Sequence, residues 1–81
     1  MKMVTVGLAG DECAVIRTIG IGVADVFWRS YLIGRVCRRG GKFVARLWDG
    51  KTHAARLGLF RTQREAVGEL WINRFDVPGV R

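Results

Sequence analysis

The sequence predicts an α+β fold, in which a three-stranded antiparallel sheet packs on one C-terminal helix, with one or two extra N-terminal strands as a variant. Residues 27–60 are rich in β-forming side chains and are divided by Gly40-Gly41 and Asp49-Gly50, which is typical of strands joined by turns. Residues 62–75 carry apolar side chains at helical spacing. The length of 81 residues, 49% of them hydrophobic, fits one small domain with a compact core.

The first third of the chain predicts strands or a docking arm rather than a helix. β-Branched residues fill the segments MVTV and CAVIRTIGIGV, and glycines recur at positions 7, 10, 20 and 22. Glycine is unfavourable inside a helix, whereas β-branched residues pack well on a pleated sheet. Residues 1–26 are therefore interpreted as an N-terminal arm or as added strands of a single domain that covers residues 1–81.

The three-stranded sheet is expected over residues 27–60. The run FWRSYLIGRVCRR ends at Gly40-Gly41, and a two-residue hairpin turn needs the positive φ angles that glycine adopts without strain. Such a turn sets the register of the two strands that it joins. The third strand, in the run THAARLGLF, places Arg56 on the basic side if the connection at Asp49-Gly50 has an odd length. The predicted cross-strand pairs are Arg39 with Lys42, Val36 with Ala45 and Arg35 with Arg46.

A helix is expected over residues 62–75, followed by a tail at residues 76–81. Thr62 is a good N-cap residue, and Glu65 three positions later completes a capping box. The helix presents one apolar face, which must cover the apolar side of the sheet. The residues of this face are Ala66, Val67, Leu70, Trp71 and Phe75.

The other side of the predicted sheet is left open and is basic. Arg35 directly opposite Arg46 is a like-charge pair, which mildly destabilises a sheet. A cluster of arginines is explained better by a ligand, because guanidinium groups bind phosphate and guanine in bidentate geometry. The side chains expected on this face are Arg35, Arg39, Lys42, Arg46 and Arg56, with Trp48 among them.

Charge is unevenly distributed along the chain, which has a formal net charge of +7. Residues 1–27 contain two basic and three acidic side chains, whereas residues 28–81 contain twelve basic and four acidic ones. A basic domain with a nearly neutral N-terminal segment suggests a polyanionic partner, of which nucleic acid is the first candidate.

The segment GRVCRRGGKFVARLWDGKTHAARLGLFRTQREAVGEL, residues 34–70, resembles the AP2/ERF-like domain and the similar arm-binding N-terminal domain of phage and transposon tyrosine integrases. The resemblance lies in a Gly-Lys-aromatic-x-Ala stretch at residues 41–45, a Leu-Gly-x-Phe-x-Thr run at residues 57–62, and Glu65-Ala66. It implies a β-β-β-α DNA-binding domain whose open sheet face enters the major groove. A free-standing copy suggests a small phage or mobile-element protein that binds double-stranded DNA.

By motif position, the resemblance implies DNA contacts at Arg46, Trp48 and Arg56. The basic face and its first hairpin turn add further cations, and a cation beside the helix N-terminus is placed to touch a phosphate group. The candidate nucleic-acid-binding residues are therefore Arg35, Arg38, Arg39, Lys42, Arg46, Trp48, Arg56 and Arg61.

An alternative function is that of a protein-interaction module. The same arginines would then bind an acidic partner, or the N-terminal strands would form a homodimer. Three tryptophans in so short a chain leave room for an exposed apolar patch, which favours such a dimer.

Other functional classes find little support in the sequence. Cys13, Cys37 and His53 fit no standard zinc spacing. The cysteines are interpreted as ordinary buried residues, and His53 as a partly buried residue at the parity of the helix side. No catalytic set is recognisable, so no enzyme activity, cofactor or small-molecule substrate is expected. The sequence has neither a signal-peptide pattern nor an apolar run long enough to span a bilayer. A cytoplasmic protein with reduced thiols and no membrane partner is expected.

Overall fold

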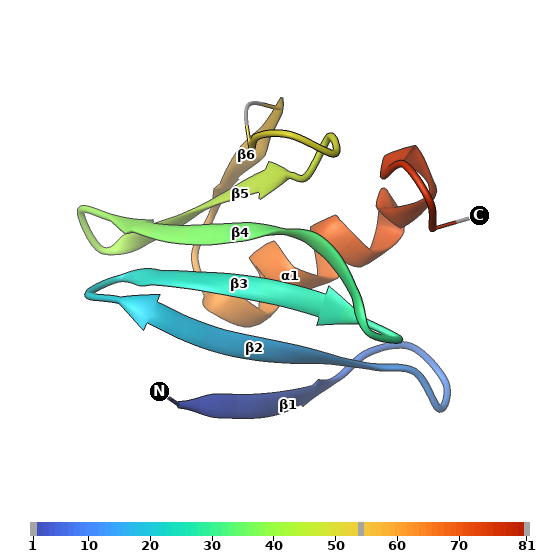
Figure 1. Ribbon diagram of the computed structural model, residues 1–81. Helices are drawn as coiled ribbons and strands as arrows, with labels where there is room; N and C mark the ends of the chain where they lie inside the picture. Colours follow the sequence, from blue (N-terminus) through green and yellow to red (C-terminus); the bar gives the residue numbers. More distant parts are fainter. Residues whose placement is uncertain (1, 54, 81) are drawn as a thin grey trace.

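The computed structural model describes residues 2–53 and 55–80 as one antiparallel sheet and a C-terminal helix (Figure 1). The strands are hydrogen-bonded in the order in which they occur in the chain, so β1 and β6 form the two edges. The six strands are β1 (Met3–Gly7), β2 (Cys13–Gly20), β3 (Val23–Trp28), β4 (Tyr31–Arg39), β5 (Lys42–Leu47) and β6 (Ala55–Phe60).

The prediction of a three-stranded sheet with one or two extra strands is wrong. Three strands, β1 to β3, precede the predicted three and continue the same sheet without a break. The prediction failed mainly at Arg29 and Ser30, which form the two-residue turn between β3 and β4 with φ angles of +50° and +69°. Because neither residue is a glycine, asparagine or aspartate, the sequence carries no strong signal for a turn with positive φ angles there, and it predicts one strand over residues 27–39.

The predicted first hairpin is confirmed. Gly40 and Gly41 have φ angles of +54° and +81°, as a two-residue turn requires, and they join β4 to β5. β5 ends at Leu47 and β6 begins at Ala55, and a register shift lies between Ala45 and Arg46 on β5. The pairs across the first hairpin include Arg39 with Lys42, Val36 with Ala45 and Arg35 with Arg46, as predicted.

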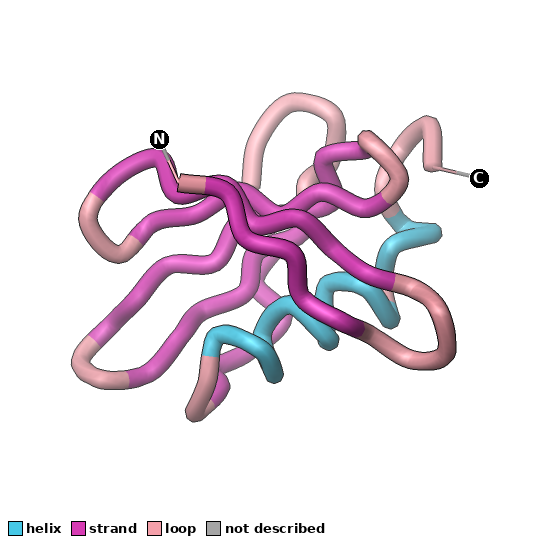
Figure 2. The backbone as a smooth tube through the Cα atoms, turned by 90° about the horizontal axis from the view of Figure 1, so that it is seen from below, coloured by secondary structure: helices cyan, strands magenta, loops and turns pink. Residues whose placement is uncertain are grey.

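Helix α1 (Gln63–Ile72) lies across one face of the sheet and contacts β4, β5 and β6 (Figure 2). Thr62 is its N-cap, and its hydroxyl accepts a hydrogen bond from the backbone N–H of Glu65 at 3.1 Å. The helix ends earlier than the sequence predicts, and a short 3₁₀ helix, η1 (Arg74–Asp76), follows it. Ala66, Val67 and Leu70 are buried against the sheet.

Leu70 packs directly on Gly34 of β4 in the centre of the core. A Cβ atom at Gly34 would lie 2.5 Å from the carbonyl oxygen of Arg46 and would also collide with Leu70. The absence of a side chain at this position therefore lets the helix approach the sheet. The core extends beyond the helix to β2 and β3, because Ile16 and Val26 are also buried.

A second packed cluster ties the C-terminal segment to β3. The guanidinium group of Arg74 lies 4.2 to 4.7 Å from the ring centroids of Trp28, Trp71 and Phe75. The indole N–H of Trp28 donates a hydrogen bond to Glu12 at 2.8 Å. These cation–π and hydrogen-bond contacts hold the C-terminal segment and the loop between β1 and β2 against β3. No helix in the described part of the chain is long and apolar enough to cross a membrane.

Candidate nucleic-acid interface

A row of charged residues crosses the sheet on the face opposite α1. Residues directly opposite each other on neighbouring strands share a face, so the pairing register defines this row. Four of its five members are arginines, and the sequence analysis identified only the part on β4 to β6. The row runs through Arg17 on β2, Asp25 on β3, Arg35 on β4, Arg46 on β5 and Arg56 on β6.

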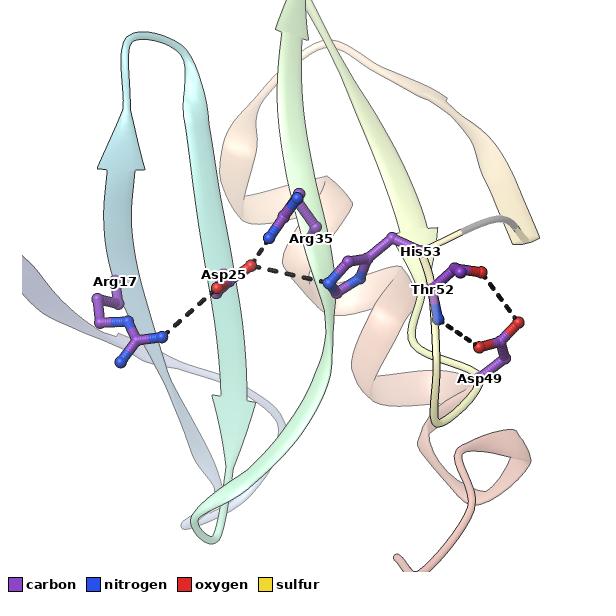
Figure 3. Close-up of polar contacts among 6 residues, drawn as sticks. All are labelled: Arg17, Asp25, Arg35, Asp49, Thr52 and His53. Atoms are coloured by element: carbon purple, nitrogen blue, oxygen red, sulfur yellow. Dashed lines mark hydrogen bonds and ion pairs between the residues drawn. The ribbon is translucent and has the colours of Figure 1, made fainter.

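Asp25 is the acidic centre of this row (Figure 3). It is only 5% exposed, and its Oδ1 accepts a hydrogen bond from Nε of Arg35 at 2.9 Å. Its Oδ2 lies 3.6 Å from a terminal nitrogen of Arg17. A carboxylate with so little access to water is stabilised by two guanidinium groups, and in return it reduces the repulsion between Arg35 and Arg46.

His53 lies over Asp25 from the loop between β5 and β6, with its Nε2 3.9 Å from Oδ1 of Asp25 (Figure 3). Burial lowers the pKa of His53, and the nearby Arg35 guanidinium acts in the same direction. The separation is too long for a hydrogen bond, and a neutral imidazole forms no ion pair at neutral pH. Asp25 therefore remains the charge that balances Arg17 and Arg35, and the prediction that His53 points to the helix side is wrong.

The loop that carries His53 is held by Asp49. Its carboxylate accepts hydrogen bonds from the backbone N–H groups of Lys51 and Thr52 at 2.8 and 2.7 Å, and these bonds lower the pKa of Asp49. The His53 ring also lies against Trp48, with 4.7 Å between the ring centroids. Trp48 packs against the core as well, so it braces this loop.

Four cationic side chains gather in a shallow hollow of about 400 Å³ that is lined by residues of β4, β5 and β6, which we call the basic hollow. Val44 and Leu59 form its apolar part, and Leu59 is 50% exposed. None of the described residues that line it is acidic. Its four cationic side chains are those of Arg39, Lys42, Arg46 and Arg56.

Three of these cations have no acidic partner within the structure. Arg39, Lys42 and Arg56 are exposed, and none of the ion pairs between described residues involves them. Like charges held together in this way repel one another unless an anion binds between them. The basic hollow is therefore suited to phosphate groups or carboxylates, and its apolar residues can contact a sugar or a base edge.

The other predicted site residues lie elsewhere. Arg35 faces the same side as the hollow but is engaged by Asp25. Arg38 pairs with Phe43 on the helix side and lines a separate small hollow with Gln63. Trp48 packs against His53 and the core, and Arg61 is exposed between β6 and α1.

Sequence reasoning missed Arg17 and Asp25, because both lie in the segment that was interpreted as an arm or added strands. The available signal was their position in the β-branched runs at residues 13–20 and 23–28, where charged residues interrupt apolar alternation. The interpretation of the cysteines also needs correction. Cys13 is exposed and Cys37 is half-buried.

Comparisons of the chain with family models, with curated proteins and with solved structures found no significant match. The resemblance to AP2/ERF-like and integrase domains therefore stays a prediction from the sequence. The order β4, β5, β6 and α1 corresponds to the β-β-β-α order of that prediction, but here it is part of a six-stranded sheet.

Proposed function

We propose that this chain is a small DNA-binding protein that contacts duplex DNA through the basic hollow. The observation that carries the proposal is the meeting of Arg39, Lys42, Arg46 and Arg56 in one hollow without an acidic residue among the described lining. Phosphate groups dominate the affinity of proteins for DNA, and guanidinium groups bind them strongly. The net charge of +7 supports the same partner, since it attracts a polyanion over a distance.

The six-stranded sheet limits how the protein approaches DNA. Six strands about 4.8 Å apart make a sheet about 24 Å wide, which exceeds the major-groove width of about 12 Å. The strands β4, β5 and β6 span only about 10 Å and carry the basic hollow along β5. In our proposal the β4–β5 hairpin faces the major groove, and the cations of the hollow contact the phosphates along its rim.

Arg35 and Trp48 have supporting roles in this proposal, because both are engaged within the fold. Arg35 is held by Asp25, and Trp48 supports the loop that carries His53. Arg56 and Lys42 are exposed and are placed to bind phosphate groups. The proposal thus retains Arg39, Lys42, Arg46 and Arg56 of the predicted face as the DNA contacts, whereas Arg35 and Trp48 support them.

The test compares two single substitutions that remove the same charge from opposite faces. Arg56→Ala removes a cation of the basic hollow, whereas Arg64→Ala removes one from α1, on the other side of the sheet. Arg56→Ala is expected to weaken binding to a 30-base-pair duplex about tenfold, which is the usual effect of losing one charged hydrogen bond. Equal affinities of the two variants would contradict the assignment of the hollow.

A second candidate function is association through the edge strand β1. Among the described residues no strand lies beside its outer edge, and Met3 and Val4 are 63% and 42% exposed. Such an edge can pair with a strand of a second copy or of another protein. Sedimentation of the chain without nucleic acid would show a dimer in this case, and protein partners would survive nuclease treatment of a lysate.

A further inference from the structure

The turn between β2 and β3 places an isoleucine where a polar residue usually lies. Ile21 is fully exposed and stands between Gly20 and Gly22, which have no side chains to cover it. Two-residue turns favour glycine, asparagine and aspartate. An exposed isoleucine at this position adds apolar surface to the protein and does not stabilise the fold. We call residues 19–22 the isoleucine tip.

A bulge next to the turn adds a second apolar side chain to this tip. Thr18 and Gly20 pair with β3, but the register shifts between them, so Ile19 has no opposite residue. Bulges turn a side chain away from the regular pleat, and Ile19 is 39% exposed. The tip therefore projects two isoleucines from the end of the sheet.

Cations flank the isoleucine tip on both sides. On the β1 side, the carbonyl of Lys2 accepts a hydrogen bond from the N–H of Thr18 at 2.9 Å. On the β4 side, the N–H of Arg38 donates to the carbonyl of Gly22 at 2.7 Å, and Arg39 of the basic hollow follows it. Figure 1 shows the β2–β3 and β4–β5 turns at the same end of the sheet, on the left.

We propose that the isoleucine tip enters the minor groove and that Ile21 wedges between two base pairs. The inference rests on the proposed function and adds a mode of binding to it. Apolar side chains that enter the minor groove unstack a base step and bend the duplex toward the major groove. The minor groove is about 6 Å wide, so a tip at its floor has phosphates on both sides, where Lys2 and Arg38 can reach them.

The position of the basic hollow agrees with this geometry. The hollow begins at Arg39, which follows Arg38 in β4 but faces the other side of the sheet. In our proposal its cations therefore contact a different stretch of backbone, which borders the major groove. Bending toward the major groove brings that backbone closer to the hollow. A lipid surface would also accept apolar and cationic groups together, but one exposed turn offers too little apolar area for stable membrane binding.

The test uses a duplex with a central TA step, in which 2-aminopurine replaces the adenine, because pyrimidine–purine steps unstack most easily. Binding of the wild type is expected to raise the 2-aminopurine emission. Ile21→Ala is expected to abolish this rise while changing the dissociation constant less than about tenfold, since phosphate contacts supply most of the affinity. Ile21→Leu is expected to restore the rise, and Ile72→Ala, on the exposed end of α1, is the matched control.

The outcomes separate this inference from the proposed function. Duplex binding without a rise in emission, or a rise that Ile21→Ala leaves unchanged, would overturn the wedge and leave DNA binding in place. Binding only to phosphatidylserine vesicles, or to neither duplex nor vesicles, would overturn both proposals. Because Ile21 is fully exposed, its substitution should not change the melting temperature, which is measured alongside.

Discussion

Arg35 on β4 and Asp25 on β3 are opposite each other in the sheet, and Nε of Arg35 donates a hydrogen bond to Oδ1 of Asp25 at 2.9 Å. This pair explains how the fold tolerates Arg35 beside Arg46. It also divides the arginine row into a part that contacts Asp25, at Arg17 and Arg35, and a part that lines the basic hollow, at Arg46 and Arg56. The proposed DNA contact follows from that division.

The first prediction concerns Asp25→Asn, which removes the negative charge between Arg17 and Arg35. The free energy of unfolding is expected to fall by about 2 kcal/mol, less than for a fully buried pair because both guanidinium groups are partly exposed. Arg35 would be released toward Arg46, so the affinity for duplex DNA should rise. Urea denaturation and DNA titration measure the two effects.

Asp11→Asn is the control for this prediction, since Asp11 is exposed and lies in the loop between β1 and β2. It makes the same chemical change and should leave stability nearly unaltered. If Asp25→Asn lowered both stability and DNA affinity, this result would contradict the prediction that Arg35 contributes to DNA binding once Asp25 no longer engages it.

The second prediction concerns the pH dependence of stability that arises from His53. Burial lowers its pKa in the folded protein below the ordinary value of 6.5. The unfolded chain therefore binds a proton first as the pH falls, and this favours unfolding. The stabilisation is complete above pH 6.5 and is lost as the pH falls toward the lowered pKa.

The melting temperature of the wild type should therefore decrease as the pH is lowered from about 7.5 to about 5.5. This range lies above the pH at which most carboxylates titrate. His53 is the single histidine of the chain, so His53→Gln should remove most of this dependence. An unchanged slope in His53→Gln would show that another group is responsible.

The third prediction compares two glycines. Gly34→Ala would place a Cβ against Leu70 and 2.5 Å from the carbonyl oxygen of Arg46. The backbone of β5 cannot easily move away, because this strand is paired on both sides. We expect a loss of about 3 kcal/mol, at the upper end of overpacking effects. Gly68→Ala, in α1, meets nothing within 4 Å and should stabilise the protein by about 0.5–1 kcal/mol. Chemical denaturation of both variants should give changes of opposite sign.

The fourth prediction tests the turn that the sequence did not reveal. Ser30 has a φ of +69°, a conformation that costs a residue with a side chain about 1 kcal/mol or more relative to glycine. Ser30→Gly should therefore raise the melting temperature. Gly41→Ser, at a φ of +81° in the next hairpin, should lower it. If Ser30→Gly were destabilising, the turn conformation would need another explanation.

The parts of the fold that were predicted from sequence are those with strong local signals. Gly40 and Gly41 determine a two-residue turn and hence the β4–β5 register, and Thr62 caps the helix as expected. The turn at Arg29 and Ser30 has no such signal, because positive φ angles there are imposed by the pairing of the flanking strands.

The candidate site was predicted only in part for a related reason. The local alternation of residues placed Arg46 and Arg56 on one face, and they are opposite each other in the sheet. The role of Arg35 depends on Asp25, which is ten residues away in the chain and lies in the segment predicted to be an arm or added strands. Cross-strand partners of this kind depend on tertiary pairing, which periodicity in a single segment does not contain.

The most direct test of the basic hollow is the salt dependence of duplex binding by the wild type and by Arg39→Ala/Lys42→Ala/Arg56→Ala. Each phosphate contact adds about 0.9 to the slope of log affinity against log salt, so the triple variant should lose about 3 units of slope. Removing three exposed cations should not reduce stability, which the melting temperature checks. Equal slopes for both proteins would contradict the account, because the hollow would then hold no phosphate.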